Sequence, residues 1–298
     1  MIYDHFAALA EVESNPEKCD EYILKYHQLT VAGKKKEAEE LKKNWQKKET
    51  NYIVDDATLE AIKEPKIDLS FLPIYSYIIQ FTFQLKTPFL SRGNNDFYII
   101  DNPVLTDKTF RSPYVAPSIW KGCLRSALWR LGYREEDTLA IRFLFGNERK
   151  EECHEALQKG RLHFFPTFFT QKSLEVINPH DRLRKVGKNP ILMEGIKQDS
   201  EGIFTLLYTP FDWTANTTDI ILRQTIECLK LTGVGLKAMF LDYGFGAKTS
   251  SGFGIAKPGI HGKFQIKANI EPIDIKNFED LCGLTDKVSQ EFNSEGGG

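Results

Sequence analysis

The chain has 298 residues, enough for one large domain or two modest ones, and its formal net charge is only −2, so any basic surface for nucleic acid has to be local. Its five cysteines form no CxxC pair, which argues against a disulfide framework and against a four-cysteine zinc site. It lacks an apolar signal core at the N-terminus and any apolar stretch of about 18 residues, so we expect a soluble protein of the cytoplasm.

The first 50 residues or so are predicted to form two helices separated by Gly33, a residue type common just after a helix end. Apolar side chains recur at helical spacing in both halves, at Tyr22, Ile23, Tyr26 and Leu29, then at Ala38, Leu41 and Trp45. Lysines interleave with glutamates along the second helix, which is typical of a solvated face, with an RNA-touching or docking surface as the alternative. Residues 51–73 carry little pattern and are expected to be a linker.

A half-buried strand is predicted over residues 75–85, where apolar side chains alternate with polar ones. A helix follows from Pro117, which suits a first turn, to about Gly132, which suits a helix end. Its core stripe is expected to be Trp120, Leu124, Ala127, Leu128 and Leu131. Lys121 and Arg125 form an adjacent basic edge near the helix N-terminus, where N–H groups favour phosphate, although such edges are more often plain solvation.

Three isolated acids precede this helix, namely Asp96, Asp101 and Asp107. Residues 108–134 then contain no acidic side chain but six basic ones, including Arg111. A segment of one charge sign beside isolated acids can hold a polyanion and still offer a carboxylate for chemistry.

Further strands are predicted over residues 162–169, where Pro166 interrupts the run, and over residues 203–208. Between them, residues 178–190 are polar and rich in Arg and Lys between two prolines, which suggests a protruding basic loop or hairpin. A helix is predicted over 217–231. The acidic stretch 269–298 ends in three glycines and is expected to be a frayed tail.

Residues 244–254 form a glycine cluster that matches neither the P-loop nor the GxGxxG motif. What remains is a loop with four glycines, a lysine and three hydroxyl side chains. Such a loop brings backbone N–H groups close to phosphate oxygens. A tight strand-to-strand connection is an equally good interpretation of the glycines alone.

The order of elements predicts an α+β protein with a ferredoxin-like core, the topology of RNA-recognition folds. We place a helical appendage at residues 1–70, the core at 71–264 with an insertion at about 166–200, and the acidic tail at 265–298. Fold alone does not assign a function.

Two segments resemble the signature of the CRISPR-associated RAMP superfamily, residues 100–104 (IDNPV) and 112–125 (SPYVAPSIWKGCLR). The similarity is closest to the Cas-seven-like backbone subunits of type III effector complexes, which carry IDNPV and then PYIPGSSLKGxLR. The cluster 244–254 resembles the superfamily's C-terminal glycine loop, and the basic insertion resembles its thumb. The resemblance covers roughly residues 75–258, and residues 116–120 depart from the Gly-Ser-Ser that precedes the lysine in the family.

The resemblance implies a subunit that binds CRISPR guide RNA within a type III complex and cleaves complementary single-stranded target RNA. The implied catalytic residue is Asp101, acting with Mg²⁺ or another divalent metal; the metal ligands are left unknown. The implied RNA-binding residues are Lys121, Arg125, Arg111, Arg182, Arg184, Gly244, Gly246, Lys248, Thr249, Ser250, Gly252 and Gly254.

Alternatives remain open at this point. Asp96 and Asp107 compete with Asp101, since an aspartate before Asn-Pro is also a good turn former. The chain could instead be a non-catalytic guide-binding subunit of the same complex. A guide-processing RAMP endoribonuclease is less favoured, because Tyr243 lies beside the glycine loop but the nearest histidine that follows is His261.

Overall fold

The computed structural model describes residues 19–49, 58, 60, 62, 64–93, 98–100, 102–134, 138–147, 158–178, 190–211 and 218–295. The chain divides into two compact units. The larger comprises residues 62–89, 114–168 and 198–298, and the smaller comprises residues up to 61 together with 90–113 and 169–197. The domain limits suggested by the sequence stay predictions. Within the described residues, no helix combines the length and apolar character needed to cross a membrane.

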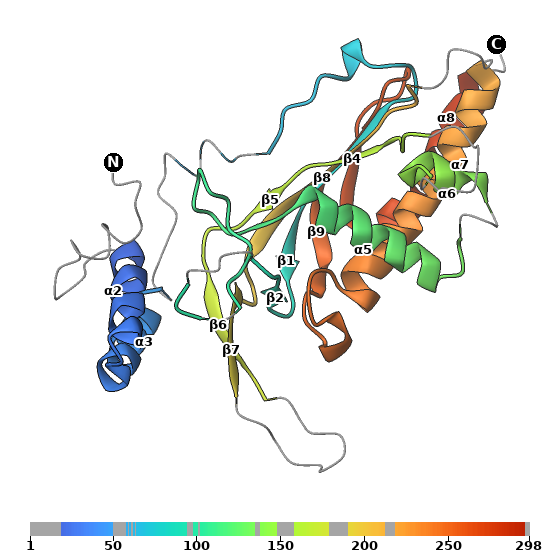
Figure 1. Cartoon of the computed structure of the whole chain (residues 1–298). Helices are drawn as coiled ribbons and strands as arrows, with labels where there is room; N and C mark the ends of the chain where they lie inside the picture. Colours follow the sequence, from blue (N-terminus) through green and yellow to red (C-terminus); the bar gives the residue numbers. More distant parts are fainter. Residues whose placement is uncertain are drawn as a thin grey trace. The chain divides into compact units, whose positions relative to one another are not determined.

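A five-stranded antiparallel sheet forms the centre of the larger unit (Figure 1). From edge to edge its strands are β10 (Ile273–Asn277), β9 (Ala256–Ile266), β1 (Tyr77–Leu85), β8 (Glu201–Tyr208) and β4 (Leu162–Phe164). In the order β9-β1-β8-β4, with helices after β1 and β8, this is the βαββαβ arrangement of the ferredoxin-like fold. The predicted α+β, ferredoxin-like core is therefore confirmed, with β10 added at one edge.

The alternation predicted for β1 is confirmed, because Tyr77, Ile79, Phe81, Phe83 and Leu85 are at most 1% exposed. These side chains contact residues of the helical layer, such as Trp120, Thr232 and Phe278. Figure 1 shows the helices covering one side of the sheet. The helices are α5 (Pro117–Arg130), α6 (Leu139–Phe145), α7 (Thr218–Ala238) and α8 (Phe278–Glu295).

Helix α5 begins at Pro117, as predicted, and buries Trp120, Leu124, Ala127 and Leu128. Leu131, predicted in the same stripe, is the residue after the helix and is 38% exposed. Gly132 follows with a φ of 94°, the left-handed conformation that commonly ends a helix.

Helix α7 is longer than predicted, because it continues seven residues past residue 231 and then passes into a π-helical turn, η3 (Met239–Tyr243). The seven added residues of α7 include two glycines, which usually weaken a helix. Here they allow close packing: a Cβ at Gly233 would lie 2.4 Å from the Leu281 carbonyl oxygen, and one at Gly235 would lie 2.8 Å from Leu124 Cδ1.

The prediction of a frayed tail after residue 269 is wrong, because this stretch forms β10 and α8. Four apolar side chains at helical spacing bury α8 against the core, namely Phe278, Leu281, Leu284 and Val288. The Asp280 carboxylate accepts the backbone N–H groups of Lys276 and Asn277, at 2.8 and 3.2 Å, and so caps the start of the helix. Glu279, Asp286 and Glu291 of this helix are exposed, so the acidic composition did not reveal the burial of its other face.

Short elements complete the larger unit. They are the 3₁₀ turns η1 (Leu69–Phe71) and η4 (Thr249–Ser251) and the two-stranded ladder of β3 (Tyr114–Val115) with β5 (Thr167–Phe168). Pro166 separates β4 from β5, which confirms the predicted interruption.

The smaller unit contains the two predicted N-terminal helices, α2 (Cys19–Val31) and α3 (Lys35–Glu49), joined through Gly33 with a φ of 73°. It also contains a three-stranded sheet in the order β2-β7-β6. Its strands are β2 (Phe89–Leu90), β7 (Ile191–Ile196) and β6 (Ser173–Ile177). Strands β6 and β7 pair antiparallel, as expected for the stem of the predicted hairpin, and the connecting residues 179–189 lie outside the described residues.

Phe240 tests this core directly, since its ring is fully buried between the sheet, α5 and α8. We expect Phe240→Ala to lower the free energy of unfolding by about 3–5 kcal/mol, because the cavity cannot close around so many aromatic neighbours. Denaturant unfolding measures the effect. Phe71→Ala, at a residue 87% exposed, is the matched control and should change it by less than about 0.5 kcal/mol.

Candidate nucleic-acid interface

The glycine loop 244–254 connects the π-helical turn to β9, so it is a helix-to-strand connection rather than the strand-to-strand connection considered from the sequence. The Phe245 N–H donates to the Gly254 carbonyl oxygen at 3.0 Å, and the Gly254 N–H donates to that of Pro88 at 2.9 Å. These bonds close the loop at its base. Gly244 and Gly254 have φ values of 74° and 72°, and a Cβ at Gly254 would lie only 2.0 Å from the Phe245 carbonyl oxygen.

Phe245 anchors the loop in the core. Its ring centroid lies 4.7 Å from that of Trp120 on α5, and both side chains are fully buried. One turn of α5 further on, burial raises the pKa of the Cys123 thiol, and a hydrogen bond from the Gly246 backbone N–H opposes this shift. The contact between Phe245 and Trp120 therefore fixes the glycine loop against the start of α5.

The loop presents polar groups away from this anchor. Lys248 and Ser250 are exposed and Thr249 is half-buried. Lys248 has a φ of 58°, a left-handed conformation rare for a residue with a Cβ. Together with Gly246 and Gly252, also at positive φ, it turns the backbone sharply in the manner of loops that direct N–H groups outward.

Lys121 and Arg125 lie one turn apart on α5. The Arg125 guanidinium carbon is 5.3 Å from the ring centroid of Phe145 and 5.9 Å from that of Trp129, so the aromatic faces hold its position. Partial burial, and then the Arg125 charge, lower the pKa of Lys121. Among the described residues, no carboxylate forms an ion pair with Lys121, so an anion bound here would stabilise its charged form.

His163 of β4 and Lys159 lie near this basic edge, but only Lys159 adds a positive charge to it. Burial, followed by the charges of Lys159 and Lys121, lowers the pKa of His163 below its ordinary value of 6.5. Sequence reasoning missed both residues as partners of α5, because about 40 positions separate them from Lys121 and no motif relates them. In the β4–β8 ladder His163 lies opposite Leu207, in the row that Ile78 continues on the open face of the sheet.

Arg111 is exposed in the smaller unit, where its N–H donates to the Asp107 carbonyl oxygen at 2.9 Å. Asp96, Asp101, Arg182 and Arg184 lie outside the described residues.

Asp107 has a structural role in the smaller unit. Its Oδ1 accepts the backbone N–H groups of Thr109 and Phe110, at 2.8 and 2.9 Å, as in an Asx turn. One of its two carboxylate oxygens is therefore already used to form the turn. This observation weakens Asp107 as a competitor of Asp101.

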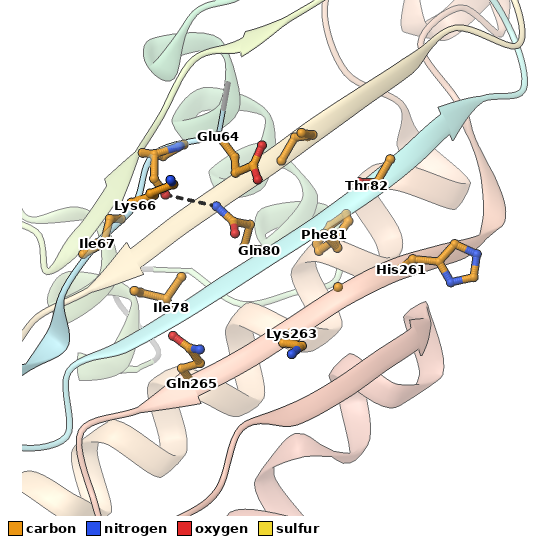
Figure 2. A pocket seen from close by; sticks show the side chains of 13 residues that line it. Glu64, Lys66, Ile67, Ile78, Gln80, Phe81, Thr82, His261, Lys263 and Gln265 are labelled. Atoms are coloured by element: carbon orange, nitrogen blue, oxygen red, sulfur yellow. Dashed lines mark hydrogen bonds between the residues drawn. The ribbon is translucent and has the colours of Figure 1, made fainter. Parts of the chain in front are cut away.

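The open face of the five-stranded sheet carries a separate pocket of about 340 Å³ (Figure 2). Gln80 and Thr82 of β1 and His261, Lys263 and Gln265 of β9 line it, beside the segment Glu64–Ile67. Gln80 holds that segment through a 3.3 Å hydrogen bond from its Nε2 to the Pro65 carbonyl oxygen (Figure 2).

This position of His261 bears on the guide-processing alternative. Tyr243 lies on the helical side of the sheet, under the Arg130 guanidinium at 5.1 Å, whereas His261 faces the pocket on the opposite side. The two side chains cannot form one acid–base pair across the sheet.

Comparison with known proteins places the fold in a family. The model of the RAMP superfamily matches residues 82–257, more than half of the chain, and the chain belongs to this superfamily. One similar solved chain belongs to the cryo-EM structure of the type III-B Cmr-beta bound to cognate target RNA. It has 20% identity and a TM-score of 0.40, over 68% of this chain and 61% of that chain. No curated protein matches.

Gly254 is the most constrained position of the glycine loop, so we expect Gly254→Ala to destabilise the larger unit. The left-handed backbone alone costs a residue with a Cβ about 1–3 kcal/mol, and the clash with the Phe245 carbonyl adds to this. Gly259→Ala, further along β9, is the control, because its Cβ would meet nothing within 4 Å. Equal unfolding free energies for the two variants would contradict the close approach at Gly254.

Proposed function

We propose that this chain is a guide-RNA-binding backbone subunit of a cytoplasmic type III CRISPR effector complex, and that it cleaves complementary target RNA through Asp101. The observation that supports binding is the basic edge of α5 beside the glycine loop on a RAMP core. The IDNPV segment, by its resemblance to nuclease subunits of the family, supports cleavage.

Guide binding needs groups that recognise phosphate without reading bases. Lys121 and Arg125 supply charge, while the glycine loop supplies backbone N–H groups and the hydroxyls of Thr249 and Ser250. Trp120 and Phe245 lock these two elements to each other, so the phosphate contacts are positioned before RNA arrives. Such preorganisation reduces the entropy cost of binding.

Cleavage would use the carboxylate of Asp101 to orient the attacking 2′-hydroxyl of a displaced target nucleotide. Positioning contributes most to such a reaction, because reacting groups that are already held in line lose little further entropy on reaching the transition state. The phosphates of the guide–target duplex would be held by the basic residues, which fixes the scissile linkage relative to the protein.

A divalent metal such as Mg²⁺ is part of this proposal. Within the described residues, no group of three or more His, Cys, Asp or Glu side chains could hold a metal ion by itself. Mg²⁺ often needs only one or two carboxylates besides RNA phosphates. Asp101, which lies outside the described residues, would supply one, and the bound metal would stabilise the charge that develops on the phosphate.

A non-catalytic guide-binding subunit is the second candidate. The same basic edge and glycine loop favour it, since they account for RNA binding without any role for Asp101. The two candidates differ in one property only, namely whether cleavage depends on this chain.

The binding half of the proposal predicts a change in salt dependence. We expect Lys121→Ala with Arg125→Ala to weaken guide RNA binding about tenfold or more and to reduce the slope of log K against log salt by about 1.4. Fluorescence anisotropy over a salt series, with guides of two unrelated sequences, measures both. Arg223→Ala with Lys230→Ala, which removes the same charges from the exposed face of α7, is the control. Equal slopes for the two double variants would refute the site.

The cleavage half predicts that Asp101→Asn lowers the cleavage rate in the assembled complex with Mg²⁺ by roughly a hundredfold or more. Guide binding should remain within about twofold, because the change is isosteric and lies outside the basic edge. Single-turnover cleavage of a guide-complementary RNA measures the rate.

Asp96→Asn and Asp107→Asn are the matched variants. Asn at 107 keeps the oxygen that accepts the N–H groups of Thr109 and Phe110 and removes only the charge. Cuts that persist in Asp101→Asn and in both other variants would identify the chain as a scaffold.

A further inference from the structure

Glu194 on β7 is a charged side chain with no exposure to solvent, in the middle of the smaller unit. Its Oε1 accepts the Tyr98 hydroxyl at 2.5 Å, and its Oε2 accepts the Val104 backbone N–H at 3.1 Å. The Glu194 backbone N–H also donates to the Asn102 carbonyl oxygen at 2.9 Å. A single residue of β7 therefore holds the segment 98–104 at three points.

A buried carboxylate is costly unless its charge is compensated. Lys172 supplies the compensation, with its Nζ 3.8 Å from Glu194 Oε1 and 3.4 Å from the Tyr98 hydroxyl oxygen. The Lys172 side chain is 9% exposed. An apolar residue at 194 could fill the same space, but it could not accept these two hydrogen bonds. The charged network at this position therefore does more than fill space, because its hydrogen bonds specify one conformation of the segment.

These contacts lie on both sides of residue 101. Tyr98 comes three residues before it. Asn102 is the next residue, and Val104 comes three residues after it. Gly93 adds a further contact after residue 101, because its N–H donates to the Pro103 carbonyl oxygen at 2.9 Å. The backbone after residue 101 is thus tied to β7 and to residue 93, and the Tyr98 side chain ties the residues before it to β7.

The N-terminal helices pack against the same segment. Trp45 of α3 is fully buried and meets the Tyr98 ring edge to face, with 5.7 Å between ring centroids and an interplanar angle of 89°. Tyr22, Trp45, Ile99 and Ile100 form one buried cluster. The two residues that precede Asp101 are therefore part of the core that the helical pair closes.

We propose that Glu194, with Tyr98 and Lys172, is the positioning residue of the Asp101 segment, and that the α2–α3 pair acts as its buttress. The inference rests on the proposed role of Asp101 in cleavage. It gives the N-terminal helices a role that no motif in the sequence indicates. It also predicts that loosening the segment slows the chemical step and leaves RNA affinity unchanged.

The activity test uses the assembled complex with the full-length chain. We expect Glu194→Gln, which keeps one acceptor oxygen and loses the charge, to lower the single-turnover cleavage rate at saturating RNA by roughly 10- to 100-fold. Target affinity should stay within about twofold, because no RNA-binding group has changed. Tyr98→Phe is the gentler variant, since it removes only the hydroxyl and keeps the ring against Trp45.

Matched controls come from the same unit. Glu175→Gln on β6 changes a glutamate whose Oε1 accepts only a side-chain hydroxyl, that of Ser173 at 3.1 Å, and it should cleave as the wild type does. Trp45→Ala tests the buttress and should slow cleavage as Glu194→Gln does. Its control is Val31→Ala at the end of α2, where the side chain is 83% exposed.

Hydrogen exchange gives a readout that does not depend on activity. The Val104 N–H donates to Glu194, so exchange in the peptide covering residues 98–105 should rise about tenfold or more in Glu194→Gln and stay unchanged in Glu175→Gln. The measurement is made on the complex used for cleavage.

The outcomes separate the two proposals. If Asp101→Asn abolishes cleavage while Glu194→Gln and Tyr98→Phe cleave at the wild-type rate, the positioning role is wrong and the proposed function stands. If Asp101→Asn still cleaves, the proposed role of Asp101 is wrong, and exchange alone decides whether Glu194 holds the segment 98–104. Unchanged exchange of the 98–105 peptide in Glu194→Gln would overturn the inference that Glu194 positions this segment.

Discussion

The burial of Trp120 is the contact on which both the core and the basic surface of the larger unit depend. Its indole touches Phe83 of the sheet, Phe240 of the π-helical turn and Phe245 of the glycine loop, and its Nε1 donates to Thr167 Oγ1 at 3.2 Å. Because the next residue is Lys121, the same helical turn that fills the core also presents the charge. Packing density there fixes the geometry of the candidate phosphate site.

Glycines serve two different purposes around this core. Gly233 and Gly235 lie within α7, where a side chain would collide with α8 or α5, so they permit close helix packing. Gly244 and Gly254 adopt left-handed conformations that close the loop over Phe245. A sequence shows only that glycine is present, and the two causes become distinct once the neighbouring backbone is known.

The smaller unit is organised by a different kind of contact, a buried charge. Glu194 and Lys172 compensate each other, and each carboxylate oxygen of Glu194 accepts a hydrogen bond, from Tyr98 and from Val104. In the functions proposed above, the larger unit holds RNA by surface charge and backbone groups. The smaller unit would hold the reactive segment by a buried polar network, and the N-terminal helices would share in that task.

The sequence by itself determined the features that depend on local periodicity and motifs. These are the strand at 75–85, the helix that begins at Pro117, the pair of N-terminal helices, the ferredoxin-like core and the RAMP membership. Tertiary structure decided what depends on residues distant in the chain. It extended α7, ordered the predicted tail as β10 and α8, and placed Glu194 against the segment around residue 101. The physical reason is that burial, close packing and charge compensation are properties of pairs of elements, whereas a sequence pattern reports one element at a time.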